Sequence, residues 1–198
     1  LGPPQLTWRG EPFAVARRQV RSLLFYLAYA ADFGEQLDWA RRSLSRAAPA
    51  PRDRLTYLFW PGLPDPDARA HLKRLLSALR SALPDGSLLL ADHSTVGLDP
   101  TRLGCDATAF ARLTAAPDPG SWAQAVALYR GPFLDGFSLP DNPEYDNWQA
   151  QVQAQLERRC LAALAGLADA RRAAGELDAA VEYARRALAL DELAEEMH

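Results

Sequence analysis

The sequence predicts a mainly α-helical chain with a small β component, divided into two domains at residues 1–104 and 105–198. In the first part, some segments have apolar residues at helical spacing and others have short strand patterns. In the second part, the apolar residues are at helical spacing almost throughout. Charge changes at the same point. Residues 1–104 hold 14 Lys and Arg against 10 Asp and Glu, a net charge of +4, whereas residues 105–198 hold 8 against 15, a net charge of −7. Only the first part therefore suits a polyanionic partner.

The clearest pattern is a helix predicted over residues 65–83. Asp65 is expected to cap its start, and Pro66 suits the first helical position. At about 100° per residue, one apolar stripe recurs along the helix and should face a core. The stripe comprises Ala68, Leu72, Leu75, Leu76, Leu79 and Leu83.

The opposite face of this helix is polar and cationic, as in helices that enter the DNA major groove. The residues predicted to approach base edges are Arg74, Ser77 and Ser81. Those predicted to reach phosphates are Arg69, His71, Lys73 and Arg80. For the helix taken alone, a solvated surface is the commoner explanation, since amphipathic basic helices are frequent.

The neighbouring segments favour the DNA interpretation. A shorter helix is predicted over residues 52–60 and ends at Pro61 and Gly62, so that two helices flank a short turn. After the longer helix, residues 88–91 and 96–98 predict a β-hairpin. Its tip, with His93, Ser94 and Thr95, should approach the minor groove or the DNA backbone. Together these elements predict a winged helix-turn-helix.

Three segments carry a specific family resemblance: RDRLTYLFWPG, ARAHLKRLLSALRSALPDGSLLLAD and VGLDP. They resemble the OmpR-type DNA-binding domain of the Streptomyces antibiotic regulatory protein family. The resemblance implies double-stranded DNA and RNA polymerase as partners. The chain departs from the family at Ala78 and Ser81, where members commonly carry arginine, and its hairpin tip holds an acid. Fewer cations predict either weaker and less salt-dependent binding or dependence on a dimer and a second site.

Before the helix-turn-helix, the sequence predicts a hairpin around residues 9–12 and a helix over residues 17–31, whose aromatic residues are expected to be core. Residues 33–51 are interpreted as an insertion that ends in a Pro/Ala linker. The insertion carries the basic residues Arg41, Arg42 and Arg46. These arginines could contact phosphate, although a solvated insertion is favoured.

The second part predicts helices over residues 121–130, 143–174 and 177–190, with the 143–174 tract expected to contain two helices. Gly175 breaks the pattern, and alanines then recur at a spacing that lets paired helices approach closely, as in a tetratricopeptide half-repeat. The phrase ALYRGPFLDGF and the helix around Trp148 resemble the bacterial transcriptional activator domain, which follows the winged helix in the same family. The resemblance implies an all-helical domain for dimerisation or signal relay.

Catalysis is not expected. The sequence has no glycine-rich phosphate loop and no HExxH motif, and His71, His93 and His198 lie in unrelated segments without metal-ligand spacing. No metal or cofactor is therefore predicted. Cys105 and Cys160 are each expected to be buried thiols, in a reducing cytoplasm. No apolar run approaches the roughly 18 residues of a membrane span.

The sequence as a whole predicts a DNA-binding transcriptional regulator, expected to be an activator. A rival interpretation is an interaction module, in which the winged helix has lost DNA affinity and the helical part binds a peptide, a protein or a small ligand. The chain begins without Met and ends inside a helical pattern, which predicts truncation at the C-terminus. The sequence is also compatible with a homodimer, with a small-molecule effector and with further domains after residue 198.

Overall fold

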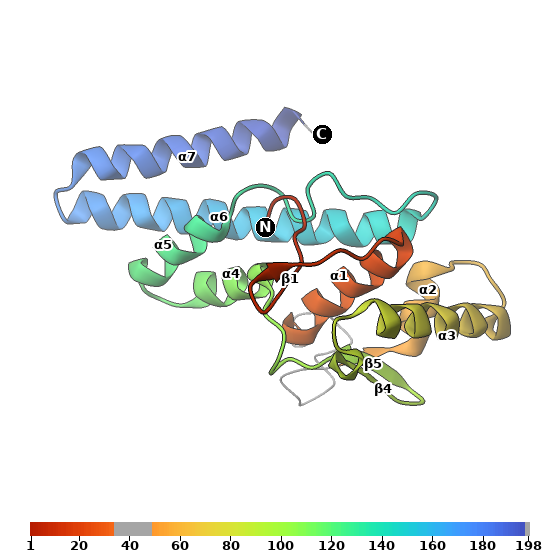
Figure 1. The fold of residues 1–198 in the computed structure, drawn as a ribbon. Helices are drawn as coiled ribbons and strands as arrows, with labels where there is room; N and C mark the ends of the chain where they lie inside the picture. The colour runs from red at the N-terminus through yellow and green to blue at the C-terminus, as the bar shows by residue number, and fades with distance from the viewer. Residues whose placement is uncertain (34–48, 197–198) are drawn as a thin grey trace. The chain divides into compact units, whose positions relative to one another are not determined.

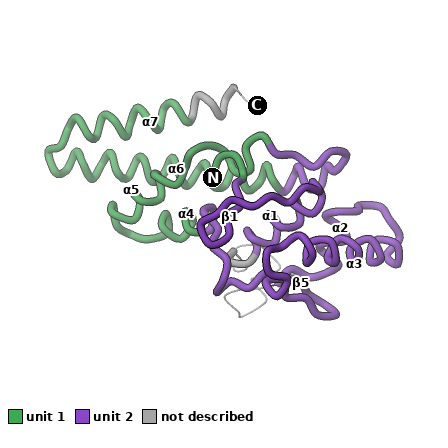
Figure 2. The backbone as a smooth tube through the Cα atoms, viewed as in Figure 1, with its two compact units in different colours: residues 1–4, 109–136, 149–198 green, residues 5–108, 137–148 purple. Residues whose placement is uncertain are grey.

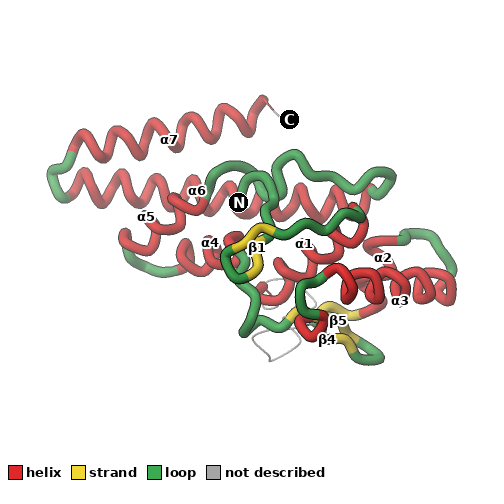
Figure 3. The backbone as a smooth tube through the Cα atoms, viewed as in Figure 1, coloured by secondary structure: helices red, strands yellow, loops and turns green. Residues whose placement is uncertain are grey.

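The structure, a computed structural model, describes residues 1–33 and 49–196 of the chain (Figure 1). It is mainly helical with two small antiparallel sheets, as the sequence predicts (Figure 3). Along the described parts of the chain, no helix combines the length and apolar character that crossing a membrane requires.

The chain forms two compact units that are interleaved in sequence (Figure 2). The mixed unit comprises Gln5–Thr108 and Phe137–Trp148, and the helical unit comprises Leu1–Pro4, Ala109–Gly136 and Gln149–His198. Compact units and independently folding domains are different properties, so the domain boundary after residue 104 stays a prediction. The segment Phe137–Trp148 nevertheless packs with residues that precede that boundary.

The mixed unit opens with a hairpin, as predicted, formed by β1 (Thr7–Trp8) and β2 (Glu11–Pro12); Glu11 and Pro12, which were predicted to belong to the turn, form the second strand. Arg9 and Gly10 connect the strands with φ angles of 54° and 89°. Two consecutive positive φ angles are those of a type I′ turn, whose twist matches that of paired strands.

Three helices form the helical part of the winged helix: α1 (Arg18–Phe33), α2 (Arg52–Phe59) and α3 (Asp65–Ala82). The predicted ranges agree with these to within two residues at each end. One detail at α3 was wrong. Pro64 is the N-cap and makes no side-chain capping bond, and Asp65 is the first helical residue. The Asp65 carboxylate instead accepts a hydrogen bond from Arg69 at 3.4 Å.

The second sheet has the order β3-β5-β4, and a 3-10 turn, η2 (Gly86–Leu88), leads into it. Its strands are β3 (Ala50–Pro51), β4 (Leu89–Ala91) and β5 (Thr95–Leu98). The prediction that residues 47–51 form only a linker was therefore wrong for Ala50 and Pro51, which pair with Val96 and Thr95. The rest of the predicted insertion, including Arg41, Arg42 and Arg46, lies outside the described residues.

An aromatic cluster forms much of the core of the mixed unit. Its rings lie about 5 to 6 Å apart between centroids and belong to Tyr26, Tyr29, Phe59, Tyr145 and Trp148. The aromatic residues of α1 are therefore core, as predicted. Asn142 anchors the segment Phe137–Trp148, because its amide donates to the Phe59 carbonyl at 3.3 Å and its oxygen accepts from the Tyr145 amide at 2.9 Å.

The elements after residue 105 are α4 (Asp106–Ala115), α5 (Pro119–Leu128), α6 (Pro143–Ala173) and α7 (Leu177–Glu196). The tract predicted as two helices over residues 143–174 is one continuous helix. Gly175 ends it with a φ angle of 79°, and the amide of Glu176 donates to the Arg171 carbonyl at 2.9 Å. This is a Schellman ending, after which α7 returns alongside α6 (Figure 1).

Candidate nucleic-acid interface

The inner face of α3 is the apolar stripe that the sequence predicts. Ala68, Leu72, Leu75, Leu76 and Leu79 are each no more than 5% exposed. This burial fixes the rotation of the helix about its axis, because turning it would bring leucines into water. The opposite face of α3 is therefore presented to solvent.

All seven residues of α3 predicted to contact DNA lie on its surface outside the apolar stripe, with Arg69 and Arg80 at the edge of that stripe. Arg69, His71, Lys73, Arg74, Ser77, Arg80 and Ser81 are all exposed. They differ in whether the side chain already has a hydrogen-bond or ion-pair partner. Within the described parts of the chain, neither Lys73 nor Arg74 forms a hydrogen bond or an ion pair. These two cations are available to a partner without breaking an existing bond.

Arg69 is shared between two carboxylates, those of Asp53 at 3.3 Å and Asp65 at 3.4 Å. The arginine and both acids are highly exposed, and exposed ion pairs of this kind contribute about 0–1 kcal/mol. Arg69 can therefore exchange these partners for a phosphate at little cost, although the two acids offset its charge locally.

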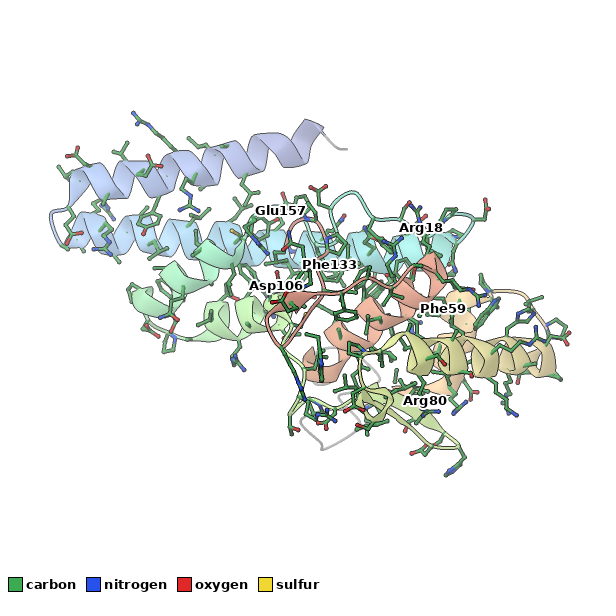
Figure 4. All side chains as sticks on the ribbon, in the orientation of Figure 1. Arg18, Phe59, Arg80, Asp106, Phe133 and Glu157 are labelled. Carbon is green, nitrogen blue, oxygen red and sulfur yellow. The ribbon has the colours of Figure 1, made fainter. Side chains whose placement is uncertain are left out.

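Arg80 leans toward the hairpin, and its Nη2 donates weakly to the Leu89 carbonyl at 3.5 Å (Figure 4). Gly86 permits this packing, because a Cβ atom there would lie 2.9 Å from Cγ of Arg80. His71 stacks on Trp60, with ring centroids 5.6 Å apart. Both residues therefore have a structural role in addition to the phosphate contact predicted for them.

The hairpin tip is built around the Asp92 carboxylate. It accepts the backbone amides of Ser94 and Thr95, each at 2.7 Å, and also both hydroxyl groups at 3.0 Å. These hydrogen bonds, the two backbone ones first, hold the pKa of Asp92 well below its usual value. His93 is exposed. The acid that looked unfavourable in the sequence is thus the residue that shapes the tip.

Arg52 is a cationic residue at the hairpin tip that was not predicted to belong to the interface. Its Nε donates to the Asp92 carbonyl at 2.8 Å, and its backbone amide donates to the Ser94 carbonyl at 2.9 Å. No local sequence pattern marks it, because the pairing of Pro51 with Thr95, which places the next residue at the tip, exists only in the folded sheet.

The described residues contain no group of three or more His, Cys, Asp or Glu side chains placed to hold a metal ion. Cys105 and Cys160 are both free thiols; Cys160 is buried as predicted, but Cys105 is only half-buried, so the prediction was wrong for Cys105. Burial raises the pKa of the Cys160 thiol to about 11, which makes it a poor nucleophile. A depression of about 310 Å³ between α1 and the sheet is mainly apolar, and only Asp92 and Thr95 bring polar side chains to it.

The fold and the exposed cationic helix define a class of protein: a winged helix joined to a helical, tetratricopeptide-like part. Residues 101–198 match the family model of the bacterial transcriptional activator domain. A solved structure of Mycobacterium tuberculosis EmbR, in complex with a low-affinity phosphopeptide, is similar in fold, with a TM-score of 0.55 at 23% sequence identity. The alignment covers 96% of this chain and 56% of that chain. No curated protein matches.

Residues 101–198 are thus similar to a bacterial transcriptional activator domain, and the similarity to EmbR concerns the fold alone. The family match points to regulation of transcription. The chain spans a little over half of the EmbR chain that it resembles.

Proposed function

We propose that this protein is a sequence-specific regulator that binds double-stranded DNA through an OmpR-type winged helix, with α3 in the major groove. The observation that carries the proposal is the outer face of α3. Lys73 and Arg74 are exposed there without partners among the described residues, on a helix whose rotation the buried leucines determine. A cationic helix face of this kind suits the groove of a polyanion.

The residues of this face take different roles in the proposal. Arg74, Ser77 and Ser81 lie nearest base edges, where arginine can bind guanine through two hydrogen bonds. Lys73, Arg69, His71 and Arg80 contact phosphates and set the register. The tip residues His93, Ser94 and Thr95 approach the backbone or the minor groove.

In this proposal the helical unit supplies dimer contacts or relays a signal to the DNA-binding part. The match to an activator domain supports activation of transcription and RNA polymerase as a partner. We also propose the cytoplasm as its location, because DNA and polymerase are found there in bacteria.

A second candidate is an interaction module without DNA affinity. The observation that favours it is an apolar stripe on α7, where Leu177, Val181 and Leu188 are 62%, 48% and 63% exposed. Exposed apolar side chains at helical spacing suit a protein partner. This function leaves the cations of α3 without a role, so DNA binding is the better supported proposal.

A fluorescence anisotropy titration separates the two candidates. The protein is titrated into a labelled duplex from the promoter region of its own gene and into a shuffled duplex of equal composition, each at two salt concentrations. DNA binding predicts tighter binding to the promoter duplex and a steep loss of affinity with salt. Equally weak, salt-insensitive signals on both duplexes would support the interaction module.

A further inference from the structure

At the hairpin tip, the donors of Ser94 and Thr95 are already engaged. Both backbone amides and both hydroxyl groups of Ser94 and Thr95 donate to the Asp92 carboxylate. This carboxylate occupies the position that a phosphate would take in an anion-binding turn. The tip therefore cannot bind a phosphate through these groups without breaking its own hydrogen bonds.

Arg52 is fixed against the same tip by two hydrogen bonds. Its amide binds the Ser94 carbonyl at 2.9 Å, and its Nε binds the Asp92 carbonyl at 2.8 Å. The preceding residue, Pro51, pairs with Thr95 in the sheet. The backbone and the side chain of Arg52 are thus both held at the tip. Binding a ligand through the guanidinium therefore costs little additional conformational entropy.

The guanidinium charge of Arg52 has no ion-pair partner among the residues that the structure describes. Its Nη1 and Nη2 atoms make no hydrogen bond or ion pair with any residue that the structure describes. Nearby arginines differ in this respect: Arg69 binds Asp53 and Asp65, and Arg102 binds Asp85 at 2.7 Å. The contact between Arg52 and Asp92 is through the Asp92 backbone carbonyl, and the Asp92 carboxylate instead accepts hydrogen bonds from Ser94 and Thr95.

We propose that Arg52 is a phosphate-binding residue, which holds the phosphodiester backbone of duplex DNA at the junction of α2 and the hairpin tip. Its two terminal nitrogens form a planar fork that matches two phosphate oxygens. Arg52 supplies at this position the contact that Ser94 and Thr95 cannot make while they are bonded to Asp92. The inference rests on the proposed function and adds to it a residue outside α3.

The test is the substitution Arg52→Gln. Glutamine keeps an amide donor within reach of the Asp92 carbonyl and removes the charge, so the thermal midpoint should stay close to that of the wild type. The matched control is Arg112→Gln, which makes the same change on the exposed surface of α4 in the helical unit. Affinities for the promoter duplex and the shuffled duplex are measured by anisotropy over a series of salt concentrations.

For Arg52→Gln, the slope of log K against log salt should fall in magnitude by about one unit, equally on both duplexes, because one phosphate contact is lost. Arg112→Gln should leave the slope unchanged. If Arg52→Gln has the wild-type slope while the wild type binds DNA, the inference is overturned and the proposed function stands. If the wild type binds neither duplex at any salt concentration, the proposed function fails.

Arg52→Lys distinguishes a phosphate contact from a structural role. Lysine keeps the positive charge and loses the Nε bond to Asp92, so the salt slope should stay near the wild-type value. A slope reduced as far as that of Arg52→Gln would overturn the inference, because it would show that Arg52 acts by holding the tip in place.

Discussion

The hydroxyl of Tyr145 donates to the backbone carbonyl of Ser22 at 3.3 Å, and both residues are fully buried. This bond joins the start of α6 to α1 across 123 residues of sequence. Burial of the phenol raises the pKa of Tyr145 far above its usual value, so the hydroxyl is neutral throughout the accessible pH range. The bond therefore acts as a neutral, pH-independent link inside the mixed unit.

Tyr145→Phe should lower the free energy of unfolding by about 1 kcal/mol, the usual net value of one buried hydrogen bond. Tyr145→Ala should cost about 3–5 kcal/mol, because it also leaves a cavity in the aromatic cluster. Urea denaturation measures both values. Tyr57→Phe is the control, since Tyr57 is 52% exposed, and should stay within about 0.5 kcal/mol of the wild type.

Arg74→Ala should leave stability within about 0.5 kcal/mol, because Arg74 is exposed and has no partner among the described residues. In the proposed complex it should cost about 1–3 kcal/mol on the specific duplex and relax the preference at one base pair. Anisotropy titrations against single-base variants of the duplex check this expectation. An equal loss on every variant would mean that Arg74 reads no base.

Lys73→Ala should behave differently from Arg74→Ala, because a phosphate contact carries no sequence information. Binding to promoter and shuffled duplexes should weaken by the same factor, and the salt slope should fall by about one unit. The same titrations measure it. A loss confined to the promoter duplex would contradict the phosphate assignment of Lys73.

Asp85, in the turn after α3, should make the stability of the protein depend on pH in the acid range. Hydrogen bonds from the Arg102 guanidinium first, and then from Ser87, hold the pKa of Asp85 well below its ordinary value of 3.8. A depressed pKa in the folded state contributes stability above the unfolded value, and that stability is lost as the pH falls through the folded value. The interaction should therefore be fully present at neutral pH.

Asp85→Asn should accordingly lower the thermal midpoint at neutral pH, and the difference from the wild type should shrink as the pH falls below 3.8. Thermal melts across that range measure the difference. Glu182→Gln, at an exposed position in the interior of α7, is the control and should show little difference at any pH. A difference for Asp85→Asn that stayed constant into acid would show that the carboxylate charge is not its source.

Gly166→Ala should destabilise the helical unit although alanine is the better helix former. A Cβ atom at Gly166 would lie 2.7 Å from the Trp122 ring, and the Trp122 indole is held by a 2.7 Å bond to the Ala116 carbonyl. Overpacking of this kind costs about 1–3 kcal/mol, against a propensity gain of about 1 kcal/mol. Urea denaturation measures the net loss. Gly104→Ala, which meets no atom within 4 Å, should be close to neutral.

Much of the candidate interface was predictable because it depends on local periodicity. The residues that share a face of α3 are set by a spacing of 3.6 residues per turn, and the leucine stripe that fixes its rotation lies within the helix itself. The hairpin positions followed in the same way from alternating residues and turn residues. The DNA roles of these residues stay predictions.

Tertiary structure decided the features that depend on partners distant in the chain. The bond from Arg52 to Asp92 spans 40 residues, and the bond from Tyr145 to Ser22 spans 123. Neither bond can be predicted from a local sequence pattern. Such bonds depend on which surfaces meet in the folded chain, whereas periodicity describes only one helix or strand at a time. The sequence by itself therefore determined the elements and their exposed faces. Only the packed structure placed Arg52 at the hairpin tip and Phe137–Trp148 in the mixed unit.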